Sequence, residues 1–209
     1  MRHKAAHACE DPEVVKRLIE ENPWAVLVSE NGGLVASHCP VLLDREVEEP
    51  TILTHLGKPD DELHGLDGGE MLAIVQGNHG YVSPSWYAAG ATPAPTWNFS
   101  VAHLYGVPER LGEEENLRVL TRLVEHFERH VEEPMLLDQE WGAPVARGGT
   151  VGIRLRASRF VCKRKLSQDK DPVSRRQAIA ALREPGPFQH PALAEEMEQA
   201  LREDGIAEG

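Results

Sequence analysis

Short apolar runs separated by turn residues fill the first part of the chain, and this pattern predicts β-strands. The runs that predict strands span residues 24–29, 34–38, 51–56 and 71–76. Asn31-Gly32-Gly33 predicts a turn between the first two strands. Pro40 interrupts the second run, so we expect residues 41–43 to follow a bend or to lie on a sheet edge.

The segment from Trp97 to Val107 has the clearest period of two in the chain. One face of this predicted strand is bulky, whereas the other is mostly small and polar because it carries Asn98 and Ser100. Such an asymmetry is expected where a strand passes a ligand. Another strand is predicted at residues 150–158, with Arg154 and Arg156 pointing outward.

Two Asp-Pro pairs mark helix starts, because Asp accepts from first-turn amides and Pro fits the first helical position. Asp11-Pro12 predicts a helix that ends near Asn22, and Asp171-Pro172 predicts one that ends near Glu184. Helical spacing of apolar residues predicts two more, at 113–131 and at about 191–202. Several short strands followed by helices that bracket a last strand indicate an α+β domain with a small barrel or strongly curled sheet.

Composition narrows the class of partner. The chain has 209 residues and a net charge of −12, which weighs against nucleic acid and against an anionic membrane surface as the main partner. It lacks an apolar signal core and a run of 18 apolar residues. Its three cysteines, with no Cys-x-x-Cys motif, fit a reducing compartment. We therefore expect a cytoplasmic protein.

Two segments combine aromatic and polar side chains. Ser83-Pro84-Ser85-Trp86-Tyr87 offers hydroxyls for a phosphate or carboxylate and rings that can cover a planar group, although an ordinary loop with a buried Trp anchor would look similar. In Thr96-Trp97-Asn98, the amide of Asn98 can donate to and accept from a heteroaromatic edge. The alternative for this second segment is a simple turn that leads into a strand.

A run of basic residues begins in the last predicted strand and continues beyond its end. Residues 154–165 carry six positive charges and no negative one inside an acidic chain, a pattern that suits a phosphate or a propionate. Ser167 and Gln168 follow with further hydrogen-bonding groups. The alternative is a solvated face that pairs with the Glu-rich helices. A DNA-binding patch is disfavoured because no recognition helix accompanies the run.

Two histidine patterns are compatible with a metal. His55 stands at the end of a predicted strand, where an imidazole can face a cofactor or ligate a haem iron. His126 and His130 have i, i+4 spacing on one predicted helix. A third ligand for this second pair is not evident, so we expect it to be a surface pair.

The same segments carry a family resemblance. In their order along the chain, residues 21–28, 33–43, 76–87, 95–99 and 165–168 resemble the PaiB-type FMN-binding negative transcriptional regulators. The Tyr-Val-Ser-Pro-Ser-Trp-Tyr and Pro-Thr-Trp-Asn-Phe blocks are the most specific parts of the match. The likeness covers roughly residues 10 to 185.

The resemblance implies a split β-barrel with flanking helices and a homodimer that holds FMN near the subunit interface. It implies a split-barrel domain at 1–165 with an inserted helix at 113–131, and a C-terminal helical segment at 166–209. The expected cofactor-binding residues are His55, Ser83, Ser85, Trp86, Trp97, Asn98, Lys163, Lys165, Ser167 and Gln168. Of these, Lys163, Lys165, Ser167 and Ser83 would hold the phosphate, and Trp86, Trp97 and Asn98 would face the isoalloxazine.

One departure from the family keeps alternatives open. After the histidine at the strand end, the family often reads Ala-x-x-Asn-Pro, but His55 is followed by Leu56-Gly57-Lys58-Pro59-Asp60. A related branch, the piperazate synthases, uses haem b to form an N–N bond by cyclising N5-hydroxyornithine, and His55 would then be the axial ligand. A third possibility is a transcriptional regulator without turnover. A small-molecule substrate is compatible with the first two readings, and no catalytic residue is predicted.

Overall fold

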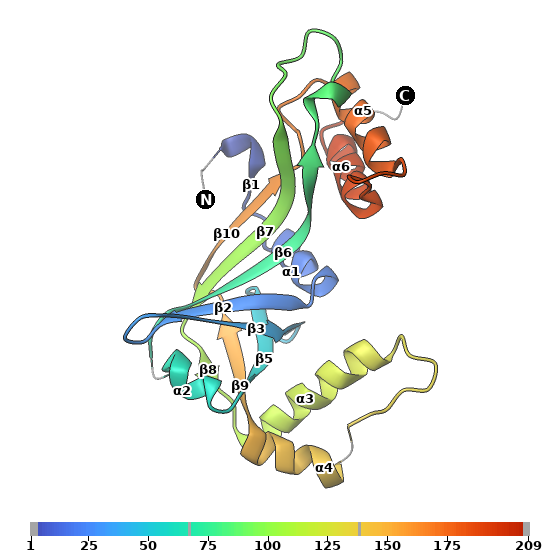
Figure 1. Ribbon diagram of the computed structural model, residues 1–209. Coiled ribbons are helices and arrows are strands. Elements are labelled where there is room, and N and C mark those ends of the chain that lie inside the picture. Colours follow the sequence, from blue (N-terminus) through green and yellow to red (C-terminus); the bar gives the residue numbers. More distant parts are fainter. Residues whose placement is uncertain (1–3, 67, 138, 207–209) are drawn as a thin grey trace. The chain divides into compact units, whose positions relative to one another are not determined.

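The computed structural model describes residues 4–66, 68–137 and 139–206. Its strands form a six-stranded sheet in the order β1-β10-β7-β6-β2-β3 and a four-stranded sheet in the order β4-β5-β9-β8 (Figure 1). The strands are β1 Ala8–Cys9, β2 Trp24–Glu30, β3 Leu34–Pro40, β4 Leu42–Leu43, β5 Thr51–Gly57, β6 Met71–Val82, β7 Thr96–Gly106, β8 Glu109–Arg110, β9 Thr150–Arg156 and β10 Arg159–Lys165.

The α-helices are α1 Pro12–Glu21, α2 Asp60–His64, α3 Glu113–Glu128, α4 Gln139–Pro144, α5 Pro172–Arg183 and α6 Pro191–Glu203. Short helical turns occur at η1 Ala5–His7, η2 Pro84–Trp86 and η3 Val145–Gly149. Asp11 and Asp171 cap α1 and α5 through their side chains, as their Asp-Pro pairs predict. Within the described ranges, no helix is long and apolar enough to span a bilayer.

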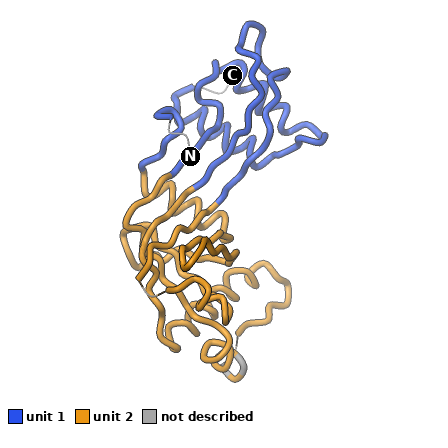
Figure 2. The backbone as a smooth tube through the Cα atoms, turned by 60° about the vertical axis from the view of Figure 1, so that its left-hand side comes forward, with its two compact units in different colours: residues 1–10, 76–101, 162–209 blue, residues 11–75, 102–161 orange. Residues whose placement is uncertain are grey.

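The chain divides into two compact units (Figure 2). Unit 1 comprises residues 1–10, 76–101 and 162–209, and unit 2 comprises residues 11–75 and 102–161. Strands β6, β7 and β10 therefore contribute residues to both units. The division at residue 165 expected from the resemblance stays a prediction.

Unit 1 has its core between a sheet and the last two helices. The buried cluster consists of Val82, Leu166, Ala178, Ile179, Leu182, Leu193, Ala194, Met197 and Ala200. A Cβ atom on Gly80 of β6 would lie 2.9 Å from Cδ2 of Leu193, so a larger residue there would displace the end of this α6 side chain. This close packing fixes which face of β6 and β7 is covered.

Unit 2 has its core where α3 packs on the four-stranded sheet. The cluster consists of Leu42, Leu53, Leu111, Val119 and Leu123. β4 lies at the edge of this sheet, as the interruption at Pro40 predicts. The helix expected at 113–131 ends instead at Glu128. Its end tightens into a turn in which Val131 N–H donates to Glu128 O at 2.8 Å, and Val131 itself is 49% exposed. The last apolar position of the predicted stripe thus has no core to face.

The alternation of Arg154 with apolar neighbours predicts a side chain that points outward into solvent. The structure shows instead that this side chain is largely covered. It is only 19% exposed, and its guanidinium forms ion pairs with three carboxylates. Nε lies 3.1 Å from Asp44, Nη1 lies 3.3 Å from Glu109, and Nη2 contacts Glu115. The prediction is wrong because these acidic groups, distant in sequence, cover the polar face of β9. Arg156, by contrast, is exposed as expected.

His64 links α2 to the hairpin of β2 and β3. It is 1% exposed, its Nδ1 lies 2.8 Å from Ser29 Oγ, and its Nε2 lies 3.0 Å from Ser37 Oγ. Burial lowers the pKa of His64 from its ordinary value of 6.5, although the charge of Asp60 opposes this shift. The fold therefore favours the neutral imidazole.

We expect this histidine to make stability depend on pH. Because its pKa is lower in the folded than in the unfolded state, its contribution is complete above pH 6.5 and is lost as the pH falls from that value through the lower pKa of the folded state. Urea unfolding from pH 7.5 to 5 should show a slope of at most about 1.4 kcal/mol per pH unit from this group. The slope should shrink in His64→Asn but persist in His38→Asn, a control at an exposed position of β3. Equal slopes in wild type and His64→Asn would refute the assignment.

Candidate functional site

Alternate residues of β7 face opposite sides of the sheet in unit 1. Asn98 and Ser100 are 0% and 1% exposed and lie on the side that α6 covers. The Asn98 amide donates to Ser167 Oγ at 2.9 Å and to Met197 Sδ at 3.3 Å, and Ser100 donates to Glu196 of α6. The small, polar face that carries the candidate Asn98 is thus covered by a helix. Any ligand surface on this part of β7 is the bulky face.

A series of aromatic rings, which we call the aromatic face, starts at Trp97 on the bulky face of β7 and ends at Trp86 in the η2 turn, where Trp86 also packs against the cluster under α5 and α6. Trp97 is 50% exposed and stacks on His79, with ring centroids 6.0 Å apart. Its ring also lies 6.5 Å from that of Tyr81. The ring of Phe188 then lies 5.1 Å from Tyr81 and 6.3 Å from Trp86. The two tryptophans expected at the cofactor are therefore joined by Tyr81, which belongs to the Tyr-Val-Ser-Pro-Ser-Trp-Tyr block, and by Phe188, which was not a candidate.

Two lysines border the aromatic face from β10. Lys165 Nζ donates to Trp97 O at 2.9 Å and also to Thr96 Oγ1. Lys163 Nζ lies 5.4 Å from the centroid of the Phe99 ring. Burial lowers the pKa of Lys165, with Asp169 opposing that shift. This side of the sheet thus combines exposed rings with two amines.

The other expected polar residues of unit 1 shape their own loops. Ser83 Oγ accepts from Ser85 N at 3.2 Å and caps the η2 turn. Gln168 accepts from Leu166 N and donates to Arg164 O, each at 2.8 Å. The side chains of Ser83 and Gln168 thus stabilise the local backbone of the loops in which they lie.

Ser167 also has a conformational role. Its φ of 65° lies in the left-handed region, and its side chain is held by Asn98. Ser167 is 2% exposed, so Asn98 and Ser167 meet beneath the surface of unit 1. Together they fix the loop that follows Lys165.

The basic run does not act as one patch. Arg159 pairs with Glu70 at 2.9 Å in unit 2, and Arg164 pairs with Glu203 of α6 at 2.8 Å in unit 1. Together with Arg154, three of the six cations thus have carboxylate partners. This arrangement corresponds to the alternative interpretation, in which the basic run pairs with acidic residues. β10 was not predicted from the sequence, because the basic side chains of the run obscure the alternation of apolar and polar positions that marks a strand.

His55 belongs to unit 2, whereas the other nine candidates belong to unit 1. It lies on β5 opposite Gly152 of β9. Its buried Nδ1 has no hydrogen-bond partner among the residues that the structure describes, and burial lowers its pKa. The imidazole is therefore neutral near pH 7. Among residues 4–66, 68–137 and 139–206, no group of three or more His, Cys, Asp or Glu side chains could hold a metal ion.

Comparison with known proteins decides the family. Residues 1–159 match the family whose description reads "Putative FMN-binding domain". The chain belongs to this FMN-binding family. It is also 27% identical over 194 residues to "Protease synthase and sporulation protein PAI 2" of Bacillus subtilis (strain 168), covering 91% of this chain and 93% of that protein. The PaiB-type resemblance and the choice of FMN as cofactor are thereby confirmed.

Solved structures of low sequence identity share the fold of this FMN-binding family member. An FAD- and haem-binding protein from Mycobacterium smegmatis has a TM-score of 0.59 at 17% identity, covering 84% of this chain and 80% of its own. The flavocytochrome Anf3 from Azotobacter vinelandii has a TM-score of 0.61 at 16% identity, covering 78% and 72%. These likenesses confirm the α+β, split-barrel fold class expected from the sequence.

Proposed function

We propose that this protein binds FMN on the aromatic face of unit 1 and acts as a redox or regulatory flavoprotein. The observation that carries the proposal is the adjacency of exposed rings and two amines on one side of the sheet. Trp97 and Lys165 are in direct contact through the Trp97 carbonyl, so a ring platform and a phosphate-binding cation lie within the reach of one ligand. When bound, FMN supplies one- and two-electron redox chemistry.

The residues of unit 1 fit a flavin in three ways. The exposed part of Trp97 offers a flat apolar surface to the isoalloxazine, with Trp86 at the other end of the same series of rings. Lys163 and Lys165 provide charge-assisted hydrogen bonds for the phosphate. Asn98 and Ser167 act from beneath, because they hold the loop that positions Lys165.

An absorption spectrum tests the proposal directly. We expect purified protein, or protein mixed with FMN, to show flavin bands, and we expect stacking on the aromatic face to quench FMN fluorescence. Removal of excess FMN by gel filtration should leave about one equivalent bound per chain. A protein without flavin bands that gains none on addition of FMN would refute the proposal.

Replacing Trp97 with alanine should weaken FMN binding about tenfold, because a lost ring contact of this kind is worth roughly 1 kcal/mol beyond buried area. Titration followed by flavin fluorescence measures the effect. Trp24→Ala is the matched control, since Trp24 is 56% exposed, stacks on His38 and lies in unit 2. A similar loss in both variants would place the flavin elsewhere.

A specific observation favours haem b as a second candidate. The neutral imidazole of His55, whose buried Nδ1 has no partner within the described part of the chain, has the protonation state that an iron ligand requires. On this reading the protein would be an enzyme of the piperazate synthase type that cyclises N5-hydroxyornithine. Addition of haem should then give a Soret band that is lost in His55→Ala. An unchanged band in that variant would exclude His55 as the ligand.

Two further expectations accompany the main proposal. A homodimer with FMN near its interface should elute from size-exclusion chromatography with light scattering at twice the 23.1 kDa mass of the chain. A regulator without turnover should instead bind DNA with sequence preference and strong salt dependence. The net charge of −12 argues against that last outcome.

A further inference from the structure

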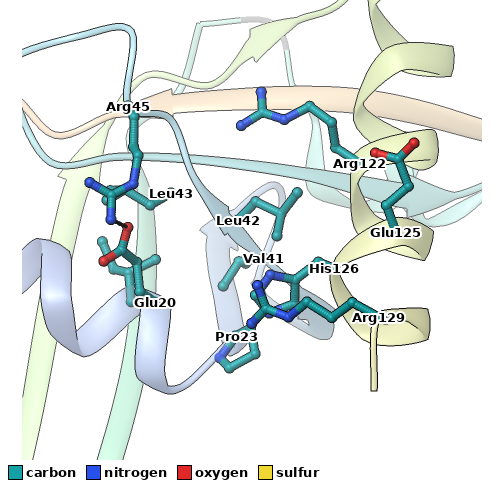
Figure 3. A pocket seen from close by; sticks show the side chains of 11 residues that line it. Glu20, Pro23, Val41, Leu42, Leu43, Arg45, Arg122, Glu125, His126 and Arg129 are labelled. Carbon is teal, nitrogen blue, oxygen red and sulfur yellow. Dashed lines mark ion pairs between the residues drawn. The ribbon is translucent and has the colours of Figure 1, made fainter. Parts of the chain in front are cut away.

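Unit 2 contains a cavity of about 560 Å³, in the range of small-molecule binding sites (Figure 3). One wall comes from the end of α1 and the segment around β4, and the other comes from the second half of α3. None of the ten residues expected at the flavin or haem site lines it. The cavity is therefore a site of its own.

The base of the cavity is apolar. Val41, Leu42 and Leu43 are 0%, 8% and 7% exposed and are joined there by Pro23. A hydrocarbon group placed on this base would leave water without displacing a polar contact. The cavity thus accepts an apolar body.

The α3 wall is cationic. Arg122 and His126 lie on α3 and Arg129 is its C-cap residue; the three have i, i+4 and i+7 spacing and line the same cavity (Figure 3). Within the described part of the chain, the Arg122 guanidinium makes no hydrogen bond or ion pair. Arg129 Nε donates to His130 Nε2 at 3.0 Å, which leaves its terminal nitrogens for another acceptor.

Acidic residues compensate this charge only in part. On the facing wall, Arg45 is already paired with Glu20 (Figure 3). Glu125 lies on α3 between the two arginines, and its carboxylate makes no ion pair with Arg122 or Arg129. In a chain with a net charge of −12, this wall presents two arginines against one glutamate. This excess of positive charge favours the binding of an anionic group beside the apolar base.

We propose that this cavity binds a small organic anion, a carboxylate with a short hydrocarbon body. The carboxylate lies between the Arg122 and Arg129 guanidiniums, whose fork geometry matches it, and the hydrocarbon covers Leu42 and Leu43. The inference does not rest on the flavin proposal, because its residues all belong to unit 2.

His126 supplies an independent readout. Burial lowers its pKa, and the charges of Arg129 and His130 lower it further. The other charged groups around the cavity are Arg122 and Glu125 on α3, Glu20 on α1, and Arg45 after β4. A bound carboxylate adds a negative charge beside the imidazole, so the pKa of His126 should rise on binding.

Calorimetry with octanoate as the probe tests the proposal on the full chain. We expect saturable binding that weakens about tenfold in Arg122→Gln and in Arg129→Gln, because each loses a charge-assisted hydrogen bond. Arg118→Gln is the matched control on the same helix, since Arg118 is 63% exposed and pairs with Glu114. Both cavity arginines are on the helix exterior, so the variants should fold as wild type does.

Two further probes separate the contribution of the negative charge from that of the hydrocarbon body. Octylamine has the same hydrocarbon and the opposite charge, and inorganic phosphate has charge without hydrocarbon, so each should bind at least about tenfold more weakly than octanoate. A nuclear magnetic resonance titration should show the pKa of His126 rising with octanoate. Equal binding of octanoate and octylamine, an equal loss in Arg118→Gln, or an unmoved His126 pKa would overturn the proposal.

Discussion

Replacing Arg154 with methionine should lower the free energy of unfolding by about 3 kcal/mol. The substitution removes the partner of Asp44, which is 2% exposed, and so leaves a buried carboxylate without its cation. Glu109 and Glu115 then add repulsion around the same point. Urea unfolding at neutral pH measures the loss.

Arg156→Met is the matched control, because this residue stands two positions along the same strand and is exposed. It should change stability by less than about 0.5 kcal/mol. Adding Asp44→Asn to Arg154→Met should recover part of the loss, since the unpaired charge disappears. Equal effects of the two arginine substitutions would show that the ion-pair cluster contributes nothing specific.

Replacing Lys163 and Lys165 together with methionine should weaken FMN binding about a hundredfold. Each lysine offers the phosphate a charged hydrogen bond worth about 1.5 kcal/mol or more, and 1.4 kcal/mol corresponds to a factor of ten. Fluorescence titration with FMN measures the change. Methionine keeps much of the side-chain length and apolar stem, so the packing on Phe99 should be disturbed little.

Riboflavin, which lacks the phosphate, is the decisive control ligand for the double lysine variant. Its affinity should be nearly the same for wild type and variant, because the isoalloxazine contacts remain. Lys58→Met, at an exposed position of unit 2, controls for loss of any positive charge. If riboflavin and FMN lose affinity equally, the lysines support the fold of the site and do not bind the phosphate.

Local signals in the sequence were sufficient for most elements of the fold. The caps of α1 and α5 could be predicted because an Asp-Pro pair acts within one helical turn. The period of two in β7 could be predicted because alternation belongs to the strand itself. β10 was missed because its basic residues leave no clear alternation of apolar and polar positions, and a partner of one of them, Glu203 of α6, lies 39 positions from Arg164.

The sequence was sufficient to predict which residues belong to the candidate site, but not the surface that these residues form. Trp86 and Trp97 stand out in the sequence, yet only the fold shows that Tyr81 and Phe188 connect them. Phe188 follows a Pro-Gly-Pro segment that reads only as a helix break. Which face of β7 is open could not be known either, because Met197 of α6, far along the chain, covers Asn98.

The order of segments in unit 1 also sets when it can form during synthesis. β1 pairs with β10, with Ala8 opposite Lys163 and Cys9 opposite Cys162. At about 5–20 residues per second, the ribosome needs roughly 10–30 seconds between making these two strands. Until β10 emerges, β1 lacks the strand with which it pairs, whereas unit 2 is already made up to the start of β10. We therefore expect unit 2 to become protease-resistant on the ribosome before unit 1, and the flavin surface to mature after unit 2.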